Sequence, residues 1–253
     1  DESKQTALHR AAVDGDVDVV SILIQNGASI NAGDWTEWTA LHFAAHNGHV
    51  DVVSILIQNG ASINVVNKDK CTALHYAAIL GHVDVISILL QNGASINAVD
   101  KWKQSALHLA AAGGHVDVAK VLLQNGADAT AVTKKNITPL YFAAKIGNVP
   151  SALLLLCFGA AIDDRALEYD KTALLRPIKD RLKSLRDMKN TTLMSDEERH
   201  YMIHIAWFLD QKCPEATFKA YCAIRSFITF HGIFMGLEYH LGALSIWNKK
   251  INK

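Results

Sequence analysis

The amino-acid sequence predicts an all-α fold, a solenoid of stacked helical repeats followed by a helical C-terminal region. The motif Thr-Ala-Leu-His starts at Thr6, Thr39 and Thr72, and variants of it start at Ser105 and Thr138, so that each start lies 33 residues after the last. A fixed spacing of this kind is typical of an array of one small unit. Apolar residues inside each unit recur at helical spacing. The spacing predicts five repeats over residues 1–165, which leaves residues 166–253 for the C-terminal region.

The first half of each unit is predicted to form a short helix, illustrated by residues 39–48. Thr39 is a suitable N-cap, since its hydroxyl can accept a free backbone N–H of the first turn. Leu41, Ala44 and Ala45 fall on one face, where the small alanines allow a neighbouring helix to approach closely. Gly48 ends the helix because glycine adopts the left-handed conformation without steric cost.

The second half of each unit is predicted to form another helix. In the same example, His49 and Val50 lead into this helix and Gly60 ends it. Its broad apolar stripe consists of Val52, Val53, Leu56 and Ile57. Two helices of about ten residues are marginally stable alone. The units must therefore stack and cover one another's apolar faces, so that stability is roughly a sum over units and interfaces.

These linked motifs resemble the ankyrin repeat over residues 1–165. The match is carried by Thr-Ala-Leu-His with Ala-Ala, by Gly-His-Val-Asp-Val-Val, and by Asn-Gly-Ala-Ser-Ile-Asn, as they stand between Thr39 and Asn64. The chain departs from the family where glycine usually stands, two residues before each start. That position holds Glu37, Lys70, Lys103 and Asn136. Either the turns there are wider, or these residues carry backbone strain.

Histidine recurs with the same 33-residue spacing, at His9, His42, His75 and His108. The resemblance implies that each ring hydrogen-bonds the backbone in the turn that joins two repeats. A shared metal ion is not expected, because neighbouring units stack about 10 Å apart while metal–nitrogen bonds are about 2 Å long.

Residues 166–253 are predicted to form further helices rich in aromatic residues, and they resemble no family. Tyr169 to Leu175 look like a sixth start, placed one residue late. The helix that follows Pro177 is expected to cap the array, and a second begins with the capping box at Ser195. A membrane span in residues 216–237 is not expected, because three of its residues are Lys219, Arg225 and His231.

No sequence motif supports catalysis or a resident cofactor, and we expect the protein not to be an enzyme. A zinc site formed by His200, His204, Cys213 and Cys222 is a weaker hypothesis than a structural role for the histidines, since these residues lack metal-ligand spacing. Two alternatives stay open. Residues 190–253 could hold an enzymatic or effector activity or bind a second partner, and the basic segment 171–189 could bind anionic lipid.

Partner contacts are expected where the repeats differ. In ankyrin-like arrays, the loop before each start and the residue after each first-helix histidine line a concave groove. The expected partner-binding residues are Arg10, Asp34, Trp35, Trp38, Phe43, Lys68, Tyr76, Lys101, Trp102, Leu109 and Lys134. Large aromatic side chains in polar turns are typical interface anchors. Trp38 has a second interpretation, in which it packs on a neighbouring loop for structural reasons.

The sequence therefore predicts a protein–protein interaction scaffold or adaptor. The nearby lysines favour a partly acidic partner, whereas the formal net charge of zero argues against a nucleic-acid partner. The four cysteines form no C-x-x-C pair and no signal peptide is expected, which together indicate a reducing compartment, the cytoplasm. Such arrays also occur in host-directed proteins of intracellular bacteria, for which this compartment would be the host cytosol.

Overall fold

The computed structural model describes residues 4–171 and residue 175, all of which belong to one compact unit, Asp1–Leu175. The helices predicted after Pro177 and from Ser195 onward lie outside the described residues. Within the described part, the chain forms eleven α-helices and no strand, so the predicted all-α fold is confirmed.

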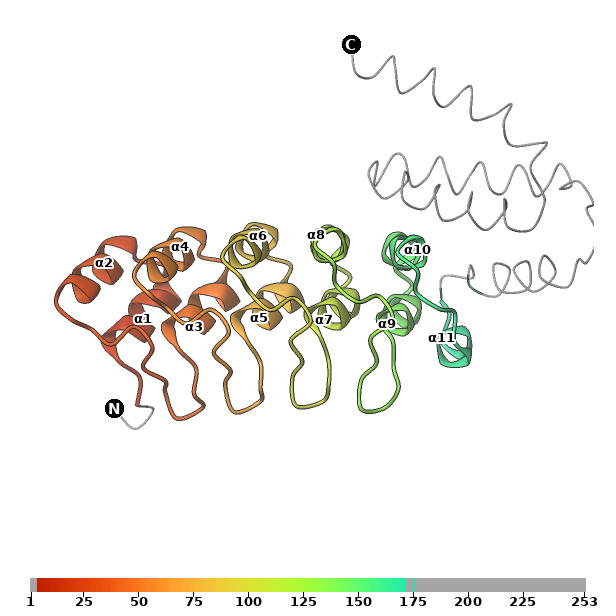
Figure 1. Ribbon diagram of the computed structural model, residues 1–253, viewed down its shortest axis with the longest axis horizontal. Helices are drawn as coiled ribbons and strands as arrows, with labels where there is room; N and C mark the ends of the chain where they lie inside the picture. The colour runs from red at the N-terminus through yellow and green to blue at the C-terminus, as the bar shows by residue number, and fades with distance from the viewer. Residues whose placement is uncertain (1–3, 172–174, 176–253) are drawn as a thin grey trace, which may run out of the picture. The chain divides into compact units, whose positions relative to one another are not determined.

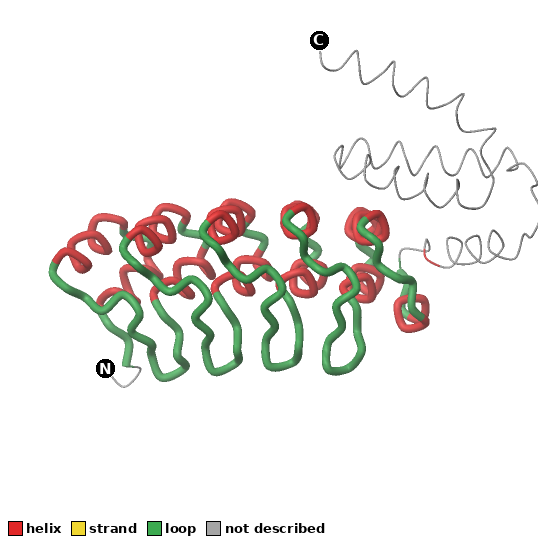
Figure 2. Tube along the Cα trace, viewed as in Figure 1, coloured by secondary structure: helices red, strands yellow, loops and turns green. Residues whose placement is uncertain are grey.

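The helices alternate between two rows (Figure 1). The first helices of the repeats are α1 (Ala7–Asp14), α3 (Ala40–Asn47), α5 (Ala73–Leu80), α7 (Ala106–Gly113) and α9 (Pro139–Ile146). The second helices are α2 (Val17–Gln25), α4 (Val50–Gln58), α6 (Val83–Gln91), α8 (Val116–Gln124) and α10 (Val149–Cys157). Each first helix packs on its own second helix, and α1, α3, α5 and α7 also pack on the next first helix. The loops between repeats all project from the same side of the helices (Figure 2).

The first helices pack closely through the residues that the sequence indicated. In α3, Leu41, Ala44 and Ala45 are fully buried. Gly48 follows the helix with a φ of 76°, in the left-handed region. A Cβ on Gly48 would lie 2.7 Å from Nδ1 of His82, so the next repeat also excludes a side chain at this position.

The second helices bury a narrower stripe than predicted. In α4, Val52, Val53 and Leu56 are buried, whereas Ile57 is half-exposed. The cap residue is Asn59, and Gly60 adopts the positive φ one residue later. The amide of Ala61 then donates to the Leu56 carbonyl (2.9 Å), which satisfies an acceptor that the end of the helix leaves free.

The recurring first-helix histidines tie each repeat to the loop that follows it, which confirms their predicted structural role. Nδ1 of His42 accepts the backbone N–H of Thr39 (3.1 Å), and Nε2 lies 3.1 Å from the carbonyl oxygen of Cys71. The same bridge from Nε2 runs from His75 to Gln104 and from His108 to Ile137, whereas Nε2 of His9 bonds the carbonyl of Ala32, earlier in its loop.

These contacts assign the neutral ring protonated at Nε2. Because Nδ1 of His42 faces an N–H donor, it must accept, and Nε2–H must donate to the Cys71 carbonyl. Burial lowers the pKa of His42 from 6.5 to about 4, although the hydrogen bond to Cys71 partly opposes the shift. Burial also lowers the pKa values of His75 and His108.

A second set of histidines, not foreseen from the sequence, connects each repeat to the one before it. His49, His82 and His115 precede the second helices, and their Nε2 atoms lie 2.9, 2.9 and 3.0 Å from the carbonyl oxygens of Val13, His46 and Ile79. In the next repeat, Nδ2 of Asn148 donates to the Gly114 carbonyl (2.9 Å). Consecutive repeats are therefore joined both forward and backward by side chain to backbone bonds.

The C-terminal end of this unit replaces the next loop with a short helix, α11 (Asp164–Glu168). Asp163 caps it by accepting the Ala166 N–H (2.7 Å) and also accepts the Thr138 hydroxyl (3.0 Å). Leu175 is fully buried, while residues 172–174 of the predicted sixth start lie outside the described residues.

We expect the unfolding free energy to fall as the pH is lowered from 7 to 5. The unfolded chain protonates His42 below about pH 6.5, whereas the folded chain resists protonation down to about pH 4, so the unfolded state binds more protons in this window. His42 alone then accounts for a loss of about 2 kcal/mol at pH 5, and the full loss is reached below pH 4.

Urea unfolding of the whole chain at several pH values measures this slope, and His42→Gln is the control, because it removes one titrating ring and should flatten the profile. A stability that stays constant between pH 7 and pH 5 would contradict the assignment of neutral rings.

Candidate partner-binding surface

The loops between repeats end in four tight turns, residues 34–38, 67–71, 100–104 and 133–137, which we call the tips. In the tip 67–71, the Asn67 amide donates to the Cys71 carbonyl (3.0 Å) and the Lys70 amide donates to the Asn67 carbonyl (2.8 Å). The other three tips are closed by equivalent pairs of bonds. Each tip is therefore a reverse turn with a fixed backbone.

The side chain of the first residue in each tip accepts hydrogen bonds from backbone amides of the same tip. Oδ1 of Asp34 accepts the Thr36 amide, the Thr36 hydroxyl and the Trp38 amide, at 2.7, 2.7 and 3.0 Å. Burial raises the pKa of Asp34, but these hydrogen bonds outweigh it and hold the pKa below its usual value. Asn67, Asp100 and Thr133 also accept two amides of their own tips. Asp34 thus shapes the tip, whatever else it contacts.

The four residues that stand where the family usually has glycine form tight turns, and their backbone adopts a strained, positive φ. Glu37, Lys70, Lys103 and Asn136 have φ values of 63°, 59°, 60° and 53°. The alternative of wider turns is therefore wrong. A side chain in this region costs about 1–2 kcal/mol because its Cβ crowds the backbone.

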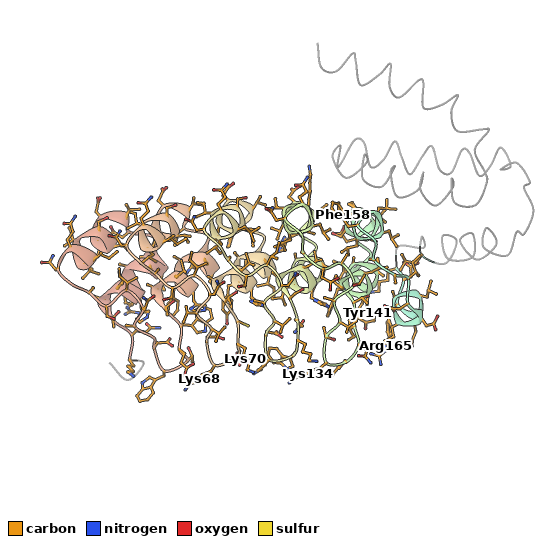
Figure 3. The ribbon with its side chains drawn as sticks, in the orientation of Figure 1. Lys68, Lys70, Lys134, Tyr141, Phe158 and Arg165 are labelled. Carbon is orange, nitrogen blue, oxygen red and sulfur yellow. The ribbon has the colours of Figure 1, made fainter. Side chains whose placement is uncertain are left out.

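Neighbouring tips are joined through their backbones. The amides of Lys68, Lys101 and Lys134 donate to the carbonyls of Thr36, Asp69 and Trp102, at 3.1, 2.8 and 2.9 Å. Lys68, Lys70 and Lys134 lie along one edge of the array (Figure 3). This edge is thus a continuous surface whose backbone is set before any partner binds.

A cluster of aromatic rings connects the tip 34–38 to the first helices. The rings of Trp38 and Tyr76 lie 4.2 Å apart, those of Trp38 and Phe43 lie 4.9 Å apart, and His46 is 5.6 Å from Trp38. These four residues, all half-exposed, form what we call the aromatic cluster. Nδ2 of Asn67 donates to the Tyr76 hydroxyl (2.7 Å) and holds that ring in place. Trp38 therefore packs on the next repeat while presenting part of its surface to solvent.

Trp35 and Trp102 are the most exposed aromatic side chains among the predicted contacts. Their exposed fractions are 59% and 49%. The ammonium of Lys101 lies 4.2 Å from the ring centroid of Trp102 and 2.6 Å from a carboxylate oxygen of Asp69. The ammonium of Lys4 lies 5.5 Å from the centroid of Trp35. Both indoles keep a large open surface.

The remaining predicted residues lie at matching places in other repeats. Arg10 is exposed on α1 and Leu109 is half-exposed on α7, at the position that Phe43 and Tyr76 occupy in α3 and α5. The series continues to Phe142 on α9, which stacks edge-on against His108 at 6.3 Å. Sequence reasoning missed Phe142, although it stands four residues after Thr138, as Phe43 stands four after Thr39.

Sequence reasoning also missed His46, which lies three residues after Phe43 and therefore on the same helical face. Near the last tip, Tyr141 contacts the rings of Phe142 and Tyr169, at 5.6 and 5.5 Å. The guanidinium of Arg165 on α11 donates to the Lys135 carbonyl, which anchors the last tip (Figure 3).

The hypotheses about the C-terminal region fall outside the described residues. These include the histidine and cysteine residues considered as zinc ligands, the activity considered for residues 190–253, and the basic segment 171–189 except for Lys171 and Leu175. In the part that the structure describes, no three His, Cys, Asp or Glu side chains gather as a metal site would require. No described helix has both the length and the apolar content that crossing a membrane demands.

Comparison with known proteins agrees with this geometry. A family model described as ankyrin repeats (3 copies) matches residues 1–67, 59–133 and 89–166, which together cover residues 1–166. A search of curated proteins found no match.

We expect Lys70→Gly to stabilise the protein by about 0.5–1 kcal/mol. Glycine removes about 1–2 kcal/mol of strain at a φ of 59°, and the greater freedom of the unfolded chain offsets part of this gain. Urea unfolding of the full chain measures the change.

Lys68→Gly is the matched control, because it makes the same exchange in the same tip at a residue that lacks a positive φ. It should leave the stability unchanged or reduce it. Equal effects of the two substitutions would show that Lys70 carries no particular strain.

Proposed function

The chain belongs to the ankyrin repeat family, whose repeats generally mediate protein–protein interactions, and on this premise we propose that it is a scaffold or adaptor that binds a partner protein through its tips and first helices. The proposed contact surface contains the predicted residues on the tips and on α1, α3, α5 and α7, together with His46 and Phe142. Recognition there needs no chemical step.

The observation that carries this proposal is the half-exposed aromatic cluster, together with two exposed tryptophans on backbone-linked tips. Aromatic side chains supply large contact areas at low entropic cost and dominate binding energies where a partner buries them. The tip-to-tip hydrogen bonds hold Trp35 and Trp102 on a surface that is already ordered. Little conformational entropy is then lost on binding.

The chemistry of the described residues suits binding rather than catalysis. Cys71 is a buried free thiol, and burial, together with the nearby Asp100 charge, raises its pKa to about 11, so it stays protonated. The first-helix histidines use both ring nitrogens in structural hydrogen bonds. A free thiol at Cys71 also suits the cytoplasm, the compartment we propose for the protein.

We expect Trp35→Ala with Trp102→Ala to weaken capture of the partner at least tenfold, because both substitutions remove exposed aromatic area from the tips. The measurement is quantitative capture from lysate by the full chain, followed by titration of the captured protein. Ile22→Ala is the matched control, since Ile22 is 56% exposed but lies on the second helix α2.

A chain shortened to residues 1–190 completes the experiment. If the tryptophan variants bind normally and only the shortened chain loses the partner, recognition belongs to the C-terminal region and the proposal fails.

A further inference from the structure

We infer that the last three tips form a binding track for an acidic polypeptide segment in extended conformation, with an apolar side chain of that segment seated on the aromatic cluster. The track is a row of exposed lysines, Lys68, Lys70, Lys101, Lys103, Lys134 and Lys135, which we call the lysine row. This inference rests on the proposed function and specifies the chemistry of the partner.

Charge changes sign along the edge formed by the tips. The tip 34–38 contains Asp34 and Glu37 and has no basic residue. The tips 67–71 and 100–104 each contain two lysines and one aspartate, and the tip 133–137 contains two lysines and no acidic residue. An acidic segment is therefore repelled at the first of these tips and attracted with increasing strength toward the last.

Asp69 and Asp100 offset two of the six lysine charges, so the row keeps a net positive charge. Asp100 is 4% exposed, and its Oδ1 already accepts the amides of Trp102 and Gln104, at 2.8 and 2.7 Å. Asp69 pairs with Lys101 at 2.6 Å. The other five lysines of the row form no ion pair with any residue from 4 to 171.

The spacing of the tips matches an extended chain. Stacked helices lie about 10 Å apart, and an extended strand advances about 3.3 Å per residue, so every third residue of a ligand meets a new tip. Three tips then span about 20 Å, or about six ligand residues. The backbone bonds from Lys101 to Asp69 and from Lys134 to Trp102 keep this spacing constant.

The aromatic cluster lies at the less basic end of the track. Tyr76 is hydrogen-bonded to Asn67, the neighbour of Lys68, so the cluster adjoins the first lysine of the row. Trp38, Phe43 and Tyr76 offer half-exposed rings there. A ligand that places an apolar side chain on these rings extends its acidic residues more favourably toward Lys134, because Asp34 and Glu37 outnumber Lys4 in the other direction.

The features favour a polypeptide over a nucleic acid. The row consists of lysines, without the arginines that fork around phosphate, and it includes an acidic side chain at Asp69. Trp35 and Trp102 lie two repeats apart, about 20 Å, so they cannot stack neighbouring bases as a single-strand site requires.

The test is fluorescence anisotropy of the full chain with a labelled peptide, Leu-Phe followed by eight glutamates. We expect binding that weakens at least tenfold when NaCl rises from about 0.05 to about 0.3 M. A peptide with glutamine in place of glutamate, and a thymidine decanucleotide, should bind at least tenfold more weakly than the acidic peptide.

Two variants with equal net charge locate the site. Lys68→Gln with Lys134→Gln removes two positive charges from the row, and Lys120→Glu changes the charge by the same amount on α8. The first variant should weaken binding at least fivefold and the second should leave it unchanged. Absence of peptide binding, equal effects of the two variants, or tighter binding of the oligonucleotide each overturns the inference.

The outcome is separable from that of the proposed function. If partner capture needs Trp35 and Trp102 but ignores the Lys68 and Lys134 substitutions, the scaffold function stands and the acidic track fails. If capture ignores the tryptophans, the proposed function fails independently of the peptide result.

Discussion

The neutral histidine at the third position of a first helix is the interaction on which the rest of the structure depends. His42 accepts the Thr39 amide that begins its own helix and donates to the Cys71 carbonyl at the end of the next tip. It thereby sets both the start of a helix and the position of a tip from one buried ring. A second proton would place an N–H against the Thr39 amide, so the bridge requires the uncharged ring.

The exposed surface follows from this scaffold. The centroid of the His42 ring lies 6.0 Å from the ring centroids of both Trp38 and Tyr76, so this side chain also packs against the aromatic cluster. Because each tip is closed internally and bonded to its neighbour, side chains can vary without changing the backbone. The strain at Lys70 and Lys103 persists for the same reason, since the surrounding hydrogen bonds outweigh the local cost.

The features that could be predicted from the sequence were those that depend on particular side chains at fixed spacing. Leu41, Ala44, Ala45 and Gly48 specify a short helix because burial and left-handed geometry restrict each position to few residue types. The backward bond of His49 was not predictable, because its acceptor is the Val13 carbonyl, and a carbonyl has no sequence signature. For the tips, residue preferences alone were compatible with either a wider turn or a tight, strained turn. The backbone hydrogen bonds that favour the tight turn have no sequence signature either.

The most direct test is nuclear magnetic resonance of the full chain with histidine nitrogens labelled, because it observes the protonation state of the bridging rings. Long-range correlations should show His42 as the Nε2–H form, with an Nε2 proton protected from exchange and a ring that stays neutral at pH 5.5. A ring protonated at Nδ1, or one that titrates near its ordinary pKa of 6.5, would contradict this account of the scaffold.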